Sequence, residues 1–428
     1  MKTDRKTDIL IVGCGVAGLY CALNLPSDKK ITVVTKEEAE KSDSFLAQGG
    51  ICVLRDEEDY ASFYEDTMRA GHYENDPASV DTMIRSSRAV IGDLISFGVR
   101  FEKEGEELAY TREGAHSRPR ILFHADETGK EITSRLLEAV RSRENITLIE
   151  GYTMVDLIHE EGECRGIIGH DRDGVYSAIL SDYTVLATGG IGGLFEHSTN
   201  FRHLTGDALA LALKHGVALR SIDYIQIHPT TLYTEKEGRA FLISESVRGE
   251  GAVLLNHKGE RFVDELLPRD VVTQAILAEM EKEGTRHVWL SLAPIEEQEI
   301  KTHFPNIYEH CLSEGYDVTK EPIPVVPSQH YFMGGIAVDG DGRTSLARLY
   351  AAGETACNGV HGRNRLASNS LLESLVFAGR AARSIAADYT EIKRTDTPTV
   401  DEACYADYKA QYKAAVLAAI EKERKSHE

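Results

Sequence analysis

The chain has 428 residues, of which 42% are hydrophobic and 27% are charged, and its formal net charge at neutral pH is −21. This length predicts more than one substructure around a large interior, and the composition excludes a disordered or fibrous chain. The negative charge repels phosphate backbones and anionic membrane surfaces, so we expect no nucleic-acid or membrane partner and a local cluster of cations around any anionic ligand.

Cysteine usage and the N-terminus bear on location. The seven cysteines are scattered without a CxxC pair or a metal-like spacing, which favours a reducing cytoplasm and predicts no metal site or iron–sulfur cluster. The apolar N-terminal run could pass for a signal peptide, but Asp8, three spaced glycines and the missing cleavage site count against it. We therefore expect a cytoplasmic protein without a membrane anchor.

The first predicted elements form a βαβ unit. A strand over Ile9–Val12, a helix over Ala17–Leu25 and a strand over Ile31–Val34 follow one another. The intervening turn reads GCGVAG (13–18), and its glycines have the spacing that lets a pyrophosphate approach the helix N-terminus. This context favours a dinucleotide site over the alternative, a glycine-rich turn without a ligand.

The end of the second strand bears on which dinucleotide is bound. It reads Val34, Thr35, Lys36 where an acidic residue commonly binds the adenosine ribose of NAD, and Glu37 comes slightly late. FAD sites tolerate more variation at this position, so the sequence favours FAD.

The middle of the chain continues the α/β pattern. Alternating apolar positions over Ile146–Leu180 indicate a strand meander, and DYTVLATGG, Asp182–Gly190, then indicates an apolar strand that ends in glycines. A helix is expected over Leu204–Gly216, with Thr205 and Asp207 offering a cap at its start.

The remaining pattern predicts a divided domain. From residue 222 to about 327 the periodicity is mixed, and YAAGETACN (350–358) then repeats the strand-and-glycine pattern. RTDTPTVDEA, after Ile392, is typical of a linker, and an amphipathic helix follows it. We expect an α/β fold: a split Rossmann-like FAD-binding domain, an inserted α+β capping domain and a short C-terminal helical tail. The predicted boundaries are 1–221 and 332–393 for the FAD-binding domain, 222–331 for the capping and substrate domain, and 394–428 for the linker and tail.

The segment HGRNRLASNSLLES, His361–Ser374, crowds arginines, asparagines and hydroxyls in front of a helix with an apolar face through Ile385. The free amides and the dipole at a helix start favour negative charge. Capping explains Ser368 or Asn369 but not the adjoining arginines, so we expect an anionic group at this helix start.

The motifs GCGVAG, AQGGI, TREGAHS, LATGG, HPT, RGEGA, PRD, GET and NRLASNSLLE occur in an order that resembles the succinate dehydrogenase and fumarate reductase flavoprotein family. The resemblance extends to about Ile385, and its details are similar to the aspartate-oxidising members. It implies FAD-dependent oxidation of L-aspartate to iminoaspartate with oxygen or fumarate as electron acceptor, the first step of de novo NAD biosynthesis, with quinolinate synthase as the next enzyme. The alternatives are a soluble fumarate reductase or succinate dehydrogenase-like flavoprotein, and a flavin-carrying scaffold without turnover.

Two stretches separate the members of this family. In SDSFLAQGG (42–50), Asp43 stands where respiratory members carry a histidine bonded covalently to the flavin, which implies that FAD is held noncovalently and disfavours a respiratory dehydrogenase. The resemblance implies L-aspartate, fumarate, succinate and oxygen as small-molecule partners. In TREGAHSRPR (111–120), Glu113 corresponds to the acidic residue that meets the substrate ammonium. Without the resemblance, this second stretch is typical of a solvated loop.

The resemblance also implies site residues. The expected substrate and catalytic residues are Arg269, His228, His330, Arg365, Glu113, Gln226 and Ser244. The expected FAD-binding residues are Gly13, Cys14, Gly15, Val16, Ala17, Gly18, Lys36, Asp43, Ser44, Ala47, Gln48, Gly49, Gly50, Asp207, Glu354, Ser370 and Leu371. Arginine suits the substrate because its planar fork binds a carboxylate with two parallel hydrogen bonds. Arg269 corresponds to the family's proton donor to carbon. Because a guanidinium is a very weak acid, we expect either a relay through Glu245 or Arg248, or only electrostatic stabilisation.

Overall fold

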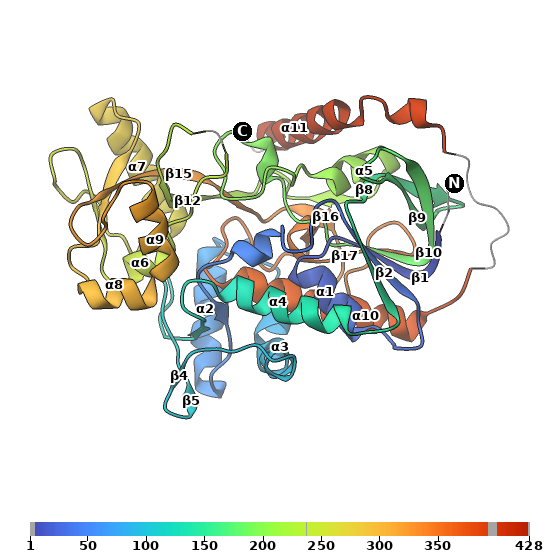
Figure 1. The fold of residues 1–428 in the computed structure, drawn as a ribbon, viewed down its shortest axis with the longest axis horizontal. Helices are drawn as coiled ribbons and strands as arrows, with labels where there is room; N and C mark the ends of the chain where they lie inside the picture. The colour runs from blue at the N-terminus through green and yellow to red at the C-terminus, as the bar shows by residue number, and fades with distance from the viewer. Residues whose placement is uncertain (1–4, 237, 393–399, 427–428) are drawn as a thin grey trace.

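The computed structural model describes residues 5–236, 238–392 and 400–426. Residues 394–399 of the predicted linker therefore lie outside the described residues. Three buried apolar cores organise the chain, two on the faces of a main sheet and one beside a second sheet. In Figure 1 the second sheet and its helices lie at the left end of the molecule, and the main sheet lies at the right.

The main sheet begins with the predicted βαβ unit. Its strands among the described residues are, in spatial order, β7 (Ile146–Glu150), β2 (Ile31–Thr35), β1 (Arg5–Val12), β10 (Tyr176–Leu186), β9 (Glu163–His170) and β8 (Thr153–Glu160), with β17 (Leu349–Ala351) paired to β10. β7, β2, β1, β10 and β17 run parallel, so their carboxyl ends meet at one edge. In doubly wound folds, ligands bind at that edge.

Two sequence predictions need correction here. The meander is confirmed for β8, β9 and β10, which pair antiparallel, but it is wrong for Ile146–Glu150, because β7 pairs parallel with β2 instead. The helix predicted over Leu204–Gly216 is α5 (Asp207–His215), and its N-cap is Gly206 with a left-handed φ of 69°. The cap expected from Thr205 and Asp207 is therefore wrong; the Thr205 hydroxyl instead donates to the Asp207 carboxylate at 2.6 Å.

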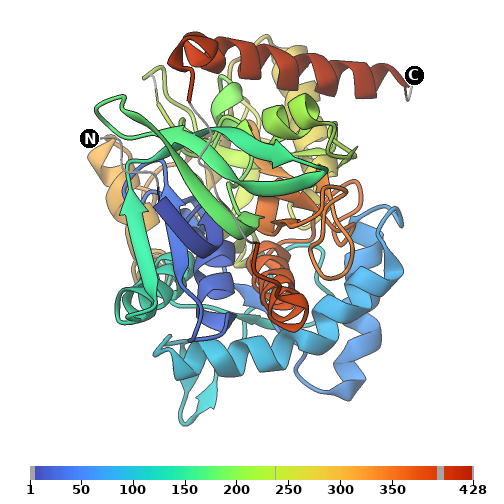
Figure 2. The same cartoon turned by 90° about the vertical axis from the view of Figure 1, so that its right-hand side faces the viewer.

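Helices cover both faces of the main sheet. On one face lie α1 (Val16–Asn24), α2 (Tyr60–Ala70), α3 (Pro77–Ser96), α4 (Thr128–Arg141) and α10 (Asn369–Asp388). On the other face lie α5 and α11 (Tyr408–Ser426), and Figure 2 shows α11 lying along the outer edge of this layer. α11 is amphipathic as predicted, because Tyr408, Tyr412, Val416 and Ile420 recur every four residues and are buried.

The second sheet lies between β11 and β16 in the chain. Its strands in the described ranges are β12 (Ile225–Leu232), β13 (Val253–Leu255), β14 (Val288–Ser291) and β15 (Ile323–Phe332), all paired antiparallel. Its helices are α6 (Glu245–Gly249), α7 (Arg269–Glu283), α8 (Glu297–His303) and α9 (Pro305–Ser313). The exact domain boundaries given above stay a prediction.

Short strands complete the fold. They are β3 (Ile51–Cys52) with β6 (Ile121–Leu122), β4 (Lys103–Glu104) with β5 (Glu107–Leu108), and β11 (Leu219–Arg220), β16 (Gly335–Ala337) and β18 (Ala356–Cys357) in one small sheet. None of the helices in the described residues combines the length and the apolar character needed to cross a membrane.

The apolar face of α10 gives a stability prediction. We expect Leu375→Ala, at a fully buried position, to lower the free energy of unfolding by about 2–5 kcal/mol, because it removes core contacts and leaves a cavity. Leu277→Ala is the matched control, because Leu277 on α7 is 43% exposed and should cost less than about 1 kcal/mol. Urea unfolding of both variants measures the difference, and equal losses would contradict the packing of α10 described here.

Candidate active site

A long pocket opens at the carboxyl ends of β1, β2 and β10 and extends to the second sheet. Nearly all predicted site residues line it: Gly13, Cys14, Gly15, Val16, Ala17, Lys36, Asp43, Ser44, Ala47, Gln48, Gly49, Gly50, Glu113, Asp207, His228, Ser244, Arg269, His330, Glu354, Arg365, Ser370 and Leu371. Gly18 lies one layer behind the lining, within α1. Gln226 also lies behind it, where its side chain contacts the two pocket arginines. The structure therefore brings the predicted residues together around one pocket.

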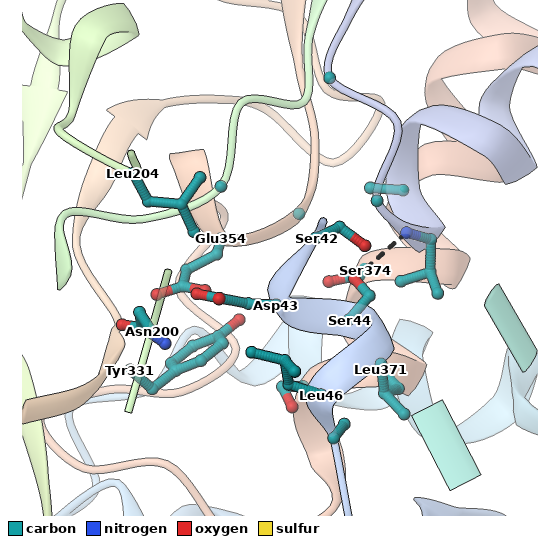
Figure 3. A pocket seen from close by; sticks show the side chains of 18 of the residues that line it. Ser42, Asp43, Ser44, Leu46, Asn200, Leu204, Tyr331, Glu354, Leu371 and Ser374 are labelled. Atoms are coloured by element: carbon teal, nitrogen blue, oxygen red, sulfur yellow. Dashed lines mark hydrogen bonds between the residues drawn. The ribbon is translucent and has the colours of Figure 1, made fainter. Parts of the chain in front are cut away.

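The glycine turn is shaped for close approach. Gly13 has a φ of +110°, and a Cβ atom there would lie 2.0 Å from the carbonyl oxygen of Ala187 at the end of β10. A Cβ on Gly18 would lie 2.0 Å from the Gly13 carbonyl oxygen. The first turn of α1 then faces the pocket, and the Val16 amide donates to the Ser44 hydroxyl at 3.2 Å (Figure 3). This is the geometry that holds a pyrophosphate on a helix N-terminus.

Several buried polar atoms in the pocket lack a partner within the described residues. They are Ser42 Oγ, Asp43 Oδ2, Gln48 Oε1, Asn200 Oδ1, His228 Nε2, Tyr331 Oη and Arg365 Nε. Buried polar atoms in folded proteins almost always have a partner, so this set indicates a large polar ligand along the whole pocket. Together with the glycine turn, it fits a dinucleotide. In the described ranges, no group of three or more His, Cys, Asp or Glu side chains could hold a metal ion.

Two carboxyl groups face each other in the middle of the pocket. Figure 3 shows Asp43, at the start of the short 3₁₀ turn Asp43–Leu46, and Glu354 pointing toward one another beside Tyr331. Each accepts one backbone amide, Asp43 from Phe201 at 2.9 Å and Glu354 from Phe332 at 3.0 Å. Burial raises the pKa of Asp43 to about 7. Burial and the neighbouring Asp43 raise the pKa of Glu354 to about 8, so this pair is readily protonated.

The far end of the pocket holds two arginines. Arg269, the first residue of α7, donates from Nε to Glu245 Oε2 at 2.5 Å and from Nη1 to Gln226 Oε1 at 2.9 Å. Arg365 lies 4.5 Å above the ring of Tyr331. Burial and the charge of Arg269 lower the pKa of Arg365 to about 10, which still leaves it charged at neutral pH. The two guanidinium groups make this end suitable for carboxylates.

Gln226 sets the orientation of these arginines. While its carbonyl oxygen accepts from Arg269, its amide nitrogen donates to Asn364 Oδ1 and to the backbone carbonyl of Arg365, each at 2.8 Å. All of its polar atoms are therefore used by protein partners, so the structure gives it a supporting position.

Two neutral histidines lie between the arginines and the rest of the pocket. Nδ1 of His228 lies 3.1 Å from both the amide nitrogen and the carbonyl oxygen of Thr230, and its Nε2 has no partner among the described residues. His330 shares a hydrogen bond with the Thr199 hydroxyl at 2.7 Å. Burial and the charge of Arg269 hold the pKa of both histidines well below the ordinary value. His228 therefore presents the Nε2 of a neutral imidazole to the pocket.

Glu113 is a negative group at the cationic end. It is 4% exposed, and it accepts the hydroxyl protons of Ser246 at 2.9 Å and of Ser368 at 2.6 Å. Burial, and then the charge of Glu245, raise the pKa of Glu113 above its ordinary value. A Cβ on Gly49 would lie 2.5 Å from the Glu113 carboxylate, so the glycine makes room for it.

The loop that carries Glu113 is braced by a fully buried arginine. Arg120 binds Asp59 at 2.9 Å and Asp66 at 2.7 Å, and it donates to His116 Nδ1 at 3.0 Å. His116 then lies 3.0 Å from the carbonyl oxygen of Ala367, next to the start of α10. The segment that is typical of a solvated loop thus buries Glu113, His116 and Arg120 in the site, while Arg112 and residues 117–119 stay exposed.

Sequence reasoning missed several residues of the pocket. They are Asn200, Arg239, Ser246, Tyr331 and Ser368, which line it or bind its side chains. Ser246 follows Glu245 on α6, and Tyr331 follows His330 on β15, but no local pattern distinguishes them from structural neighbours. Ser368 occupies the N-cap position of α10, but its side chain caps no amide of that helix and instead donates to Glu113, so capping does not explain its hydroxyl.

Comparison with known proteins places this geometry among flavoproteins. A family model described as an FAD binding domain matches residues 8–371. An L-aspartate oxidase of Clostridium perfringens is 52% identical over 382 residues, covering 89% of this chain and 87% of the relative. An L-aspartate oxidase of Clostridium acetobutylicum is 50% identical, covering 91% and 90%.

Solved structures agree. The FrdA chain of E. coli quinol fumarate reductase superposes with a TM-score of 0.85 at 29% identity, covering 99% of this chain and 75% of that one. Mycobacterium smegmatis Sdh1 superposes with a TM-score of 0.77 at 32% identity, covering 95% and 72%.

The glycine turn gives a test of cofactor binding. We expect Gly18→Ala to weaken FAD binding by roughly tenfold or more, because the new Cβ clashes with the Gly13 carbonyl and displaces the turn. Overpacking of this kind costs about 1–3 kcal/mol, and about 1.4 kcal/mol of lost binding free energy corresponds to tenfold in affinity. The ratio of flavin to protein absorbance after gel filtration measures the loss. Gly92→Ala on α3, where a Cβ meets nothing within 4 Å, is the control and should keep its FAD. Full FAD retention by Gly18→Ala would contradict the assignment.

Proposed function

This chain belongs to the L-aspartate oxidase family of FAD-binding flavoproteins, and we propose that it oxidises L-aspartate to iminoaspartate and returns the electrons to fumarate or oxygen. The observation that supports this most is the combination of Glu113 with two arginines at one end of the FAD pocket. An amino diacid carries two negative groups and one positive group, and this pocket offers the complementary set.

The substrate would lie between α10 and the second sheet. We assign its two carboxylates to Arg365 and Arg269, with the side chains of His228, His330 and Ser244 completing the two carboxylate sites. The Glu113 carboxylate accepts hydrogen bonds from the ammonium group. Bound FAD supplies the hydride-accepting chemistry; the side chains named here bind and orient the diacid beside it.

Arg269 has the position expected of the family's proton donor. Its Nε is 2.5 Å from Glu245, and the same carboxylate oxygen is 3.7 Å from Arg248 Nη2. All three side chains are buried. This contiguity supports a relay through Glu245 and Arg248 when fumarate is protonated at carbon, whereas oxidation of the amine needs only the positive charge of Arg269.

The cofactor would be held without a covalent bond. Asp43 carries no nucleophilic nitrogen, and its carboxyl group accepts a backbone amide while facing Glu354. We assign the pyrophosphate to residues 13–18 and the flavin to residues 43–50 and the start of α10, with Lys36 and Asp207, 2.7 Å apart, at the adenosine side. Acid treatment should therefore release the flavin.

The cellular setting is also a proposal. We place the enzyme in the cytoplasm, at the first step of NAD biosynthesis, where its imine product is passed to quinolinate synthase. The domain division at residues 221/222 and 331/332 is proposed on the separate apolar core of the second sheet. A soluble fumarate reductase is the second candidate, favoured by the likeness to E. coli fumarate reductase and opposed by the buried Glu113 carboxylate.

Anaerobic titration distinguishes these functions. We expect L-aspartate to bleach the flavin without oxygen and fumarate to restore its colour, because the pocket matches an amino diacid. Succinate, which lacks the ammonium group, is the control and should leave the flavin oxidised. A flavin that stays oxidised with L-aspartate but is reduced by succinate would favour the second candidate.

The role of Arg269 has its own test. We expect Arg269→Leu to lower kcat/KM for L-aspartate by roughly 10²–10³, because one preorganised positive group at the reacting centre is lost while FAD stays bound. Arg261→Leu is the matched control and should keep the turnover of the wild type. Arg261 also pairs with a buried carboxylate, that of Glu265 at 2.6 Å, but it lies on the surface. Unchanged turnover in Arg269→Leu would support a flavin-carrying scaffold instead.

A further inference from the structure

The substrate end of the pocket has a simple charge balance. Three guanidinium groups, those of Arg248, Arg269 and Arg365, surround two carboxyl groups, those of Glu113 and Glu245. All five side chains are less than a tenth exposed. With both carboxyl groups ionised, this end carries one net positive charge, and uncompensated charge in such a site is unfavourable.

The two ligands of the proposed function differ by one unit of charge. L-Aspartate, with its ammonium group, carries one net negative charge, and fumarate carries two. The first therefore neutralises this end of the pocket, while the second leaves it with one negative charge unless a carboxyl group takes up a proton.

Glu113 and Glu245 differ in their capacity to take up that proton. Glu245 Oε2 accepts a charged hydrogen bond from Arg269 at 2.5 Å and lies 3.7 Å from Arg248. Among the described residues, the side-chain partners of Glu113 are two hydroxyl groups, those of Ser246 and Ser368. A hydroxyl can donate to a carboxylate or rotate and accept from a carboxylic acid, whereas a guanidinium can only donate.

We propose that Glu113 binds one proton when fumarate occupies the pocket and releases it when L-aspartate does, so that one site accepts both an amino diacid and a diacid without an amine. This inference rests on the proposed function. Ser246 and Ser368 are its positioning residues, because they hold the carboxyl group toward the ligand in either protonation state.

The other groups that face Glu113 do not compete for this proton. Burial raises the pKa of the Cys52 thiol well above its ordinary value, so it stays neutral. Burial and the charge of Arg120 lower the pKa of His116 to about 4, so it is also neutral. Burial raises the pKa of Glu245, but Arg269 and Arg248 outweigh it and hold that carboxyl ionised. The remaining neighbours, Arg248, Arg269 and Arg365, are cations.

Proton uptake measures the proposal directly. Fumarate is titrated into the oxidised holoenzyme, which cannot reduce it, in two buffers of different ionisation enthalpy at weakly alkaline pH. The difference in heat gives the protons taken up per fumarate bound. We expect about one for the wild type, and an affinity for fumarate that falls by up to about tenfold per pH unit once the pH exceeds the pKa of Glu113.

L-Aspartate should show the opposite sign. Because it needs ionised Glu113, the second-order rate of anaerobic flavin reduction should fall as the pH is lowered through the same pKa. Glu113→Gln should bind fumarate with no proton uptake and with pH-independent affinity. Ser246→Ala, which removes one donor to the carboxylate, should move the proton uptake to higher pH and remains informative if Glu113→Gln fails to fold. Glu299→Gln, at an exposed position on α8, should behave as the wild type.

The outcomes separate this inference from the proposed function. Fumarate binding without proton uptake, or uptake that persists in Glu113→Gln, would overturn the inference even if L-aspartate reduces the flavin. Failure of L-aspartate to reduce the flavin would overturn the proposed function, whatever the number of protons taken up with fumarate.

Discussion

Buried charges lose their solvation by water, and the constraint on which this structure depends is that ion pairs and hydrogen bonds must compensate that loss. Arg120 is fully buried, and it is tolerated because Asp59 and Asp66 both bind it. Arg269 is anchored in the same way by Glu245 and Gln226. Breaking such a pair costs several kcal/mol, of order 3–5, because it strands a charge in a poorly solvated interior. The paired groups consequently hold the loops of the pocket in a single arrangement.

These anchors join parts of the chain that are far apart in sequence. The Arg120 network fixes the loop that carries Glu113, and His116 extends it to the start of α10. Gln226, on β12, ties Arg269 to the segment before α10. The main sheet thus provides the dinucleotide turn, the helices beside the second sheet carry Arg248 and Arg269, and the segment before α10 carries Arg365.

Local patterns were enough to predict the first part of this arrangement. The spacing of Gly13, Gly15 and Gly18 between a strand and a helix predicts the turn, because strand, turn and helix periodicity are short-range properties. Almost all the residues that motif order predicts for the site lie in the pocket, although they make up only part of its lining. What could not be predicted depends on pairing across the chain: β7 pairs with β2 rather than joining the meander, and the hydroxyls of Ser246 and Ser368 converge on Glu113 from two substructures. No sequence period encodes such a convergence.

Residue 368 meets two demands at once. Its backbone is left-handed, with a φ of 59°, a conformation that glycine adopts most easily. Its hydroxyl accepts the Gly50 amide at 3.2 Å and donates to Glu113, which glycine cannot do. Threonine has the hydroxyl, but its β-branched carbon is disfavoured at positive φ. Serine therefore combines an unbranched side chain, which tolerates the left-handed backbone, with the hydroxyl group that glycine lacks. Substitutions meant to stabilise the protein, whether chosen by consensus or to relieve backbone strain, should leave residue 368 unchanged.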